Sequence, residues 1–247
     1  MEQKSHRIVP VGVLGVIVAV AAFSVQAAVN FQRETHFRCY TVSQQTPQPA
    51  ESVTLSDQFI AEATVTIDEP LQFCTPTSKN GEAIREEEEH LTMYAAPQEL
   101  TPDLRVFTED QFGERTLTVI GARVLLVPTQ KLVGGLGFPE KLNHSWCYEA
   151  AGPRVRRRVT LEDQFGANRV RVERPRFFCN PVEKTHGGVT TPIEEPDVHL
   201  TCYEIFGLQK TQATQFGVSN QFEQDTFTVT SFQLLCVPSE KKGFEPL

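Results

Sequence analysis

The stretch His144-Ser-Trp-Cys147-Tyr148 recurs three more times along the chain, each time with its histidine and its tyrosine. The other copies begin at His36, His90 and His199, so successive copies are 54, 54 and 55 residues apart. Each copy is followed by Asp-Gln-Phe or Asn-Gln-Phe, and then by a proline with a lysine three residues beyond it. A fixed period of this length indicates four copies of one structural unit.

The four repeats alternate between two types. Repeats one and three end in Cys-Thr-Pro76 and Cys-Asn-Pro181, whereas repeats two and four end in Leu-Val-Pro128 and Cys-Val-Pro238 and open with His-Leu-Thr. We therefore expect the folding unit to be a pair of repeats of about 100 residues, which is a normal domain size. Glycine and proline are concentrated at residues 132–143, which predicts an exposed linker between two such pairs.

Short segments such as Val65-Thr-Ile67 and Leu117-Thr-Val119 alternate apolar and polar residues, and no helical period appears after residue 27. This alternation with β-branched residues predicts half-buried strands, about four in each repeat. The expected fold is therefore all-β, with two tandem β-sandwich or barrel-like domains at residues 28–131 and 144–247. A single four-bladed propeller-like array is the alternative.

Residues 1–27 have the layout of a secretory signal peptide. Lys4 and Arg7 precede an uncharged run over residues 8–25, and Val25-Gln-Ala27 provides small residues at the cleavage positions. An uncleaved membrane anchor is the alternative, because the run is just long enough to span a bilayer. In both cases we expect a secreted, periplasmic or cell-surface protein, in a compartment where disulfides persist.

Six cysteines occupy equivalent positions in three of the four repeats, and repeat two has Met93 and Leu126 in their places. Pairing within each repeat leaves no cysteine without a partner. The predicted disulfides are Cys39–Cys74, Cys147–Cys179 and Cys202–Cys236. A metal site built from His36 and a Cys39 thiolate is the alternative, although an oxidising compartment favours disulfides. Strand alternation places Phe37 and Cys39 on one face and Arg38 and Tyr40 on the other.

The second motif begins with aspartate or asparagine in every repeat. These side chains hydrogen-bond to nearby backbone amides, so the motif predicts a turn whose phenylalanine packs into the core. A calcium site at Asp57, Asp110 and Asp163 is the weaker alternative, because calcium loops cluster several acidic ligands and each repeat offers one. We expect no cofactor and no resident metal.

The repeated histidines do not predict catalysis, because a catalytic site is a single constellation of unlike groups. The sequence contains no nucleophile elbow, HExxH motif, phosphate-binding loop or dinucleotide-binding motif. The net charge of −8 argues against a nucleic-acid partner. We therefore expect a non-enzymatic structural or binding module, with a secreted hydrolase or lyase of unknown substrate as the alternative.

Arginine is concentrated in repeat three, with eight in residues 154–176. The candidate anion-binding residues occupy alternate positions, and therefore one face, of each of two predicted strands. They are Arg154, Arg156, Arg158, Arg169 and Arg171. If these strands are neighbours, they form a cationic face that suits carboxylate, sulfate or phosphate, as on an anionic polysaccharide or an envelope component. The face could instead pair with Glu86–Glu89 of the same chain, or be merely solvated.

The motif series of repeats three and four resembles an uncharacterised family of secreted bacterial repeat proteins. The residues that carry the resemblance are Asp163–Gly166, Cys179–Lys184, His199–Tyr203, Asn220–Phe222 and Cys236–Lys241. The first half departs from the pattern, because it lacks one cysteine pair and has Ile60 and Thr75 where glycine and asparagine are usual. The resemblance implies a secreted repeat scaffold and brings no catalytic residues.

Overall fold

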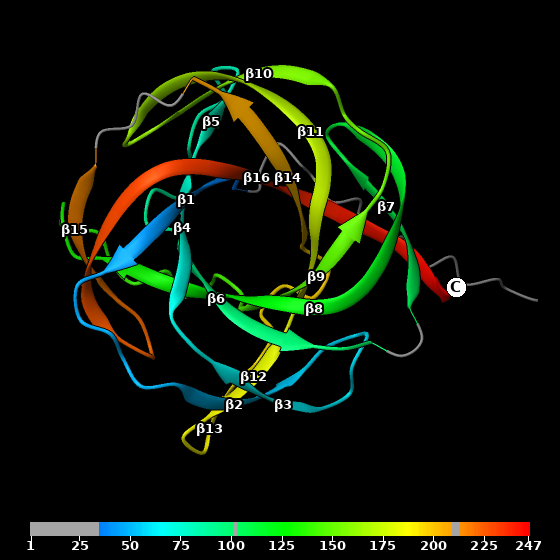
Figure 1. Ribbon diagram of the computed structural model, residues 1–247, viewed down its shortest axis with the longest axis horizontal. Coiled ribbons are helices and arrows are strands. Elements are labelled where there is room, and N and C mark those ends of the chain that lie inside the picture. The colour runs from blue at the N-terminus through cyan, green and yellow to red at the C-terminus, as the bar shows by residue number, and fades with distance from the viewer. Residues whose placement is uncertain (1–34, 101–102, 209–212) are drawn as a thin grey trace, which may run out of the picture.

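Strands make up the regular structure of the computed structural model, which describes residues 35–100, 103–208 and 213–247 (Figure 1). No helix occurs in these residues, so the predicted all-β fold class is confirmed. The predicted signal peptide at residues 1–27 lies outside the described part of the chain. Within that part, no helix has the length and apolarity needed to cross a membrane.

Every repeat contributes the same sequence of elements. The opening strands, which start at the histidine motif, are β1 (Phe37–Gln44), β6 (His90–Gln98), β9 (Ser145–Ala151) and β14 (His199–Gly207). The hairpins that follow are β2 (Glu51–Ser56) with β3 (Ala63–Ile67), β7 (Leu104–Asp110) with β8 (Gly113–Lys131), β10 (Arg157–Asp163) with β11 (Gly166–Pro181), and β15 (Thr214–Ser219) with β16 (Gln224–Pro246). The return strand that carries the proline motif is β4 (Pro70–Pro76) in repeat one, and the later part of β8, β11 or β16 in the others. The remaining short strands are β5 (Ser78–Lys79), β12 (Glu183–His186) and β13 (Val189–Thr191).

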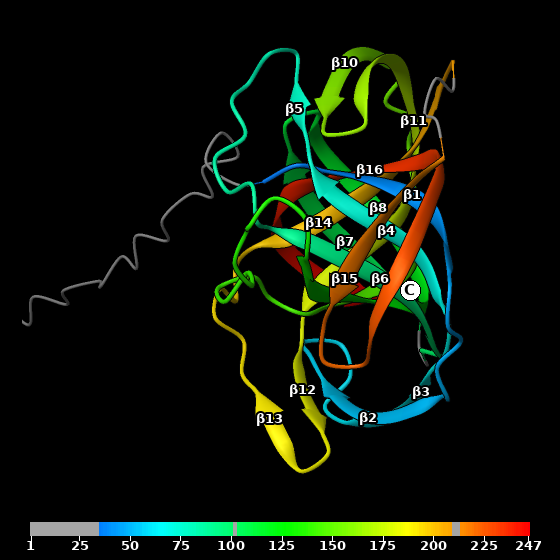
Figure 2. The same ribbon diagram turned by 90° about the vertical axis from the view of Figure 1, so that its left-hand side faces the viewer.

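Eight of these strands close into an antiparallel ring, which Figure 1 shows along its axis. The pairing order is β1, β4, β6, β8, β9, β11, β14 and β16, and β16 pairs again with β1. Each repeat supplies two neighbouring ring strands, and the four hairpins lie around the outside (Figures 1 and 2).

The expectation of two tandem domains is not confirmed, because the ring contains strands from both predicted halves. Strand β8 pairs with β9 and β1 pairs with β16, so the halves at residues 28–131 and 144–247 share one continuous sheet. Four ring strands alone would leave two open edges, and joining the halves pairs those edges. The propeller-like alternative is also not confirmed, since strands hydrogen-bond between repeats instead of forming separate blades.

The segment at residues 132–143 connects β8 to β9 within the ring and is not an interdomain linker. Its first residues are exposed, but Leu142 packs against the core cluster inside the ring. It lines a small cavity of about 40 Å³ together with Phe37, Leu91 and Leu200. The segment therefore plugs the end of the ring at which the opening strands begin.

The three disulfides face the inside of the ring and are Cys39–Cys74, Cys147–Cys179 and Cys202–Cys236, the pairs that the repeat register predicts. Each joins two residues that lie directly opposite one another on neighbouring ring strands. Met93 and Leu126 hold the equivalent positions in repeat two and belong to the same buried cluster. Phe37 faces this cluster too, whereas Tyr40 faces a second cluster outside the ring, as strand alternation predicts.

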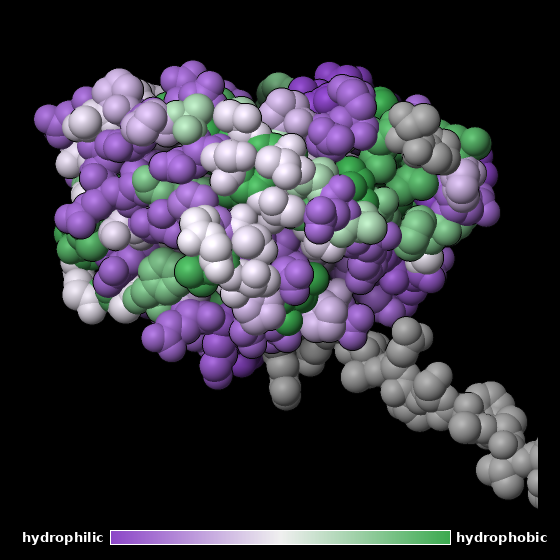
Figure 3. Space-filling model, turned by 90° about the horizontal axis from the view of Figure 1, so that it is seen from below, coloured by the Kyte–Doolittle hydropathy of each residue, from purple (hydrophilic) through white to green (hydrophobic). Residues whose placement is uncertain are grey.

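Two further cores lie between the ring and the hairpins. Hairpins β2–β3 and β7–β8 cover one, which includes Trp146 and Tyr148 of the ring. Hairpins β10–β11 and β15–β16 cover the other, which includes Tyr40 and Tyr203. On the side of the molecule that carries β2, β12 and β13, hydrophilic residues surround smaller hydrophobic patches (Figure 3).

The alternation of repeat types follows from contacts across the ring. The segment after the proline motif of repeat one, β5, pairs with β10 of repeat three, and β12 of repeat three pairs with β2 of repeat one. In the same way, the end of β8 pairs with β15, and the end of β16 pairs with β7. Repeats one and three therefore pair with each other and belong to one sequence type, and repeats two and four pair with each other and belong to the second type.

Candidate functional site

The repeated motif residues come together in clusters, which we call clamps, each built from three different repeats. In one clamp, the Tyr40 hydroxyl of repeat one donates to the Asp163 carboxylate of repeat three at 3.0 Å. The neighbouring Gln164 donates to Nε2 of His90 in repeat two at 3.3 Å and accepts from the Lys131 ammonium. Phe165 completes the clamp with its ring edge against Tyr40, 4.9 Å between centroids.

The other three clamps contain the equivalent residues, each taken from the next repeat along the chain. Their tyrosine pairs with the first residue of the turn motif, as Tyr94 with Asn220, Tyr148 with Asp57, and Tyr203 with Asp110. Nε2 of Gln221 lies 2.6 Å from Nε2 of His144, and the side chain of His36 lies beside that of Gln111. The tyrosine contact joins each of the four hairpins to the ring. The histidine–glutamine contact accompanies it in three of the four clamps, so these repeated motif residues have a structural role.

The turn aspartates accept hydrogen bonds from protein donors. One carboxylate oxygen of Asp57 accepts from the amides of Phe59 and Ile60, at 2.8 and 2.9 Å, and the other accepts from Tyr148 at 2.8 Å. Asp110 and Asp163 accept from the amide two residues ahead, at 2.6 and 2.8 Å. These are the contacts of the predicted turn, and the carboxylates proposed as calcium ligands belong to three separate hairpins. In the described ranges, no three His, Cys, Asp or Glu side chains are grouped so that they could hold a metal ion.

The repeated histidines are buried at the start of the opening strands. Burial lowers the pKa of His36, His90 and His199 to about 4 and that of His144 to about 3. His90 donates from Nδ1 to the Glu88 carbonyl at 3.0 Å, which leaves Nε2 as the acceptor for Gln164. The metal alternative at His36 and Cys39 is wrong, because the Cys39 sulfur is bonded to Cys74 and faces the inside of the ring.

One buried ion pair was not predicted from the sequence. Arg38 and Asp163 both have fully buried side chains, and Nε of Arg38 lies 2.6 Å from the carboxylate. The guanidinium also donates to the Asn168 side chain at 2.9 Å and to the Gly166 carbonyl at 2.6 Å. The equivalent positions in repeats two and four hold threonine. Strand alternation predicts that Arg38 lies on the same face of β1 as Tyr40. Nothing in the sequence identifies its partner 125 residues away.

The candidate anion-binding arginines lie mainly on one exposed hairpin, β10–β11. These two strands are antiparallel neighbours, and Arg158 lies directly opposite Arg171, while Arg169 is opposite Thr160. Arg158, Arg169 and Arg171 are exposed on the face opposite Val170 and Val172, and we call these three residues the arginine face. Arg154 and Arg156 are exposed in the segment that leads into β10.

Carboxylates pair with only some of the arginines at residues 154–176, which we call the arginine cluster. Glu173 pairs with Arg171 and lies 3.5 Å from Arg154, while Glu149 and Glu204 pair with Arg176 and Arg174 at 3.0 and 2.7 Å. Arg158 and Arg169 form no ion pair within residues 35–100, 103–208 and 213–247. The alternative that places Glu86–Glu89 against this cluster is not what the structure shows, since the glutamates that pair with it belong to β9, β11 and β14.

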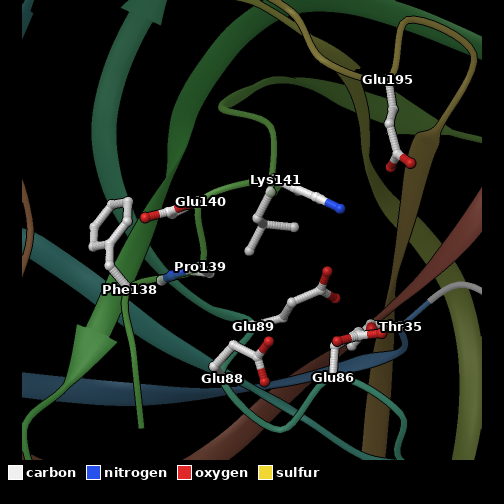
Figure 4. Close-up of a pocket in the computed structure, with 10 residues that line it drawn as sticks. Thr35, Glu86, Glu88, Glu89, Phe138, Pro139, Glu140, Lys141 and Glu195 are labelled. Atoms are coloured by element: carbon white, nitrogen blue, oxygen red, sulfur yellow. The ribbon is translucent and has the colours of Figure 1, made fainter.

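A second charged feature, an acidic hollow of about 440 Å³, lies over the plugged end of the ring (Figure 4). Three loops line it with carboxylates, which belong to Glu86, Glu88, Glu89, Glu140 and Glu195. Lys141 projects from the loop that also carries Glu140 (Figure 4). The hollow therefore concentrates negative charge at the end of the molecule that Leu142 closes.

The comparisons with known proteins give one family. A model described as a repeat of unknown function (DUF7450) matches residues 90–238, which run from the first residue of repeat two to the proline motif of repeat four. No curated protein and no solved structure matches the chain. Because the match covers more than half of its length, the chain belongs to this repeat family.

Proposed function

We propose that this member of the DUF7450 repeat family is an extracytoplasmic, non-enzymatic binding module whose arginine face holds anionic groups. The ligand class is an anionic polysaccharide or a similar polymer of the cell envelope. Three disulfides are compatible with an oxidising compartment. The role of the clamps supports a binding module over an enzyme, since the repeated polar residues are used to hold hairpins.

The observation that carries the proposal is the arrangement of the arginine face. Like charges directly opposite each other on neighbouring strands destabilise a sheet, and Arg158 and Arg171 occupy such a pair of positions. Glu173 offsets part of this charge at Arg171, but Arg158 and Arg169 have no carboxylate partner in the described ranges. An external sulfate, carboxylate or phosphate would supply one, and guanidinium forks match these groups geometrically.

The test is retention on a heparin column at low salt, with heparin as the anionic probe. The wild-type protein is expected to bind despite its net charge of −8, and R169E/R171E is expected to pass through unretained. The matched control is R105E/K242E, which changes the net charge equally at two exposed cations outside the arginine face. Wild-type protein that is not retained would refute the proposal, and so would equal loss of retention in both double variants.

A further inference from the structure

The end of the ring opposite the histidines contains a hollow of about 610 Å³, which we call the mouth. Its lining comes from six ring strands, β4, β6, β8, β11, β14 and β16. The apolar floor consists of Met93, Val124, Phe177 and Leu234, which belong to the core cluster inside the ring. A concave, largely apolar space of this size at the opening of a closed sheet is typical of small-ligand sites.

Two residues of the mouth distinguish it from ordinary core. Met93 stands where the other three repeats have a disulfide-bonded cysteine, and methionine is flexible enough to repack around different ligands. Gln72 donates to Gln233 at 3.2 Å, but its own Oε1 is buried and has no hydrogen-bond partner among the described residues.

The inner face of the ring continues from the mouth onto the arginine face. On β14, Cys202 and Phe206 share one face by strand alternation, and Cys202 points into the ring. Phe206 lies directly opposite Arg171 on β11, so these side chains lie on the same face of the sheet. The opposite face, with Val170 and Val172, is buried in the core under the hairpins.

Phe206 is the residue that joins the two regions. It lines the mouth, and it also lines a shallow hollow formed with Arg158, Arg169 and Arg171. Phe206 is 53% exposed, and Leu208, two residues further along the chain, is 78% exposed. The surface therefore runs from an apolar hollow, across an exposed aromatic ring, to a group of arginines.

From this continuity we propose that the mouth and the arginine face together bind one molecule of an anionic amphiphile. Its apolar chain lies in the mouth against Met93 and Leu234, and its anionic group lies on Arg169 and Arg171. Charge complementarity selects an anionic head group, and the apolar floor selects a chain. The inference rests on the proposed function, because it assigns the anionic group to the same arginine face.

The experiment is a calorimetric titration of the whole protein with inorganic sulfate and with butyl, hexyl, octyl and decyl sulfate, all below micelle-forming concentrations. A chain that enters the mouth should tighten binding by about fourfold for each methylene fully buried. Heparin retention is measured on the same samples. Chain-length dependence together with heparin retention supports the inference.

Variants separate the two parts of the surface. F206S should weaken decyl sulfate binding by about five- to tenfold, because half of an aromatic contact is lost, and should leave heparin retention unchanged. The control F138S removes a phenylalanine of similar exposure, 45%, from the acidic hollow, and should change neither. R169E/R171E should weaken both decyl sulfate and heparin.

Three outcomes would overturn the inference. If heparin is retained but alkyl sulfates bind no better than sulfate, the mouth takes no chain and the proposed function survives. If alkyl sulfates bind with chain-length dependence that R169E/R171E leaves intact, the head group lies elsewhere. If the protein floats with anionic phospholipid vesicles but binds no soluble alkyl sulfate, it recognises a bilayer surface and not a single chain.

Discussion

The buried pair of Arg38 and Asp163 offers a test of how the repeats interlock. Replacing Arg38 by methionine keeps most of the side-chain volume. It also leaves the fully buried Asp163 carboxylate without its ionic partner. Removing one partner of a buried ion pair costs about 3–5 kcal/mol, because the remaining charge has no counterion. Replacing Asp163 by asparagine should cost a similar amount by leaving the guanidinium unpaired.

The double variant R38M/D163N should be less destabilised than the sum of the single variants by about 2 kcal/mol or more. Repeat four already uses asparagine at this turn position, where Asn220 accepts from the Phe222 amide at 2.9 Å, so the turn itself tolerates the change. The assay is urea unfolding followed by the fluorescence of Trp146, the single and fully buried tryptophan. A cost below about 1 kcal/mol for R38M, or additive single costs, would refute the reasoning.

Three further changes test other parts of the structure by urea unfolding. Burial lowers the pKa of His144 from 6.5 to about 3, so its contribution to stability is complete above pH 6.5 and is lost as the pH falls toward 3. His144→Gln should therefore make the free energy of unfolding fall less steeply across that range, by about one proton, and an unchanged slope would contradict this. Tyr148→Phe removes the hydroxyl that donates to Asp57 at 2.8 Å and should cost about 1–3 kcal/mol, whereas no measurable cost would show that the contact is unimportant. The variant C202M/C236L copies the residues of repeat two and should fold with a loss of about 4 kcal/mol for a closed loop of 34 residues, and failure to fold would show that the ring requires that disulfide.

Much of the local structure could be predicted because each repeat carries its own signals. The period located the strands, the cysteine register identified the disulfide pairs, and the Asp-Gln-Phe motif indicated a turn. Strand alternation also places Arg169 and Arg171 on the exposed face of β11, opposite Val170 and Val172. Each of these depends on residues within one repeat, which is the distance over which backbone periodicity and turn chemistry act.

Ring closure was not predicted, because it depends on which repeats pair with one another. From the sequence alone, the alternation of repeat types indicates two neighbouring pairs, whereas in the structure it reflects pairing between repeats on opposite sides of the ring, as between β5 and β10. The mouth could not be found for the same reason, since its floor takes residues such as Met93 and Leu234 from strands far apart in the chain. The replacement of a cysteine by Met93 is the one signal of the mouth that the sequence contains.

The most direct test of the closed ring is to cut the intact protein between Gly134 and Gly135. Both glycines are exposed, with open space around them, and both have positive φ angles, 92° and 73°. A protease site inserted between them, with both glycines kept, should therefore leave the fold undisturbed. All three disulfides lie within one half of the chain or the other, so no covalent bond joins the halves after cleavage. The particle mass is then measured by size-exclusion chromatography with light scattering. The ring predicts one particle with the mass of the uncut chain, and two separate particles of about half that mass would contradict it.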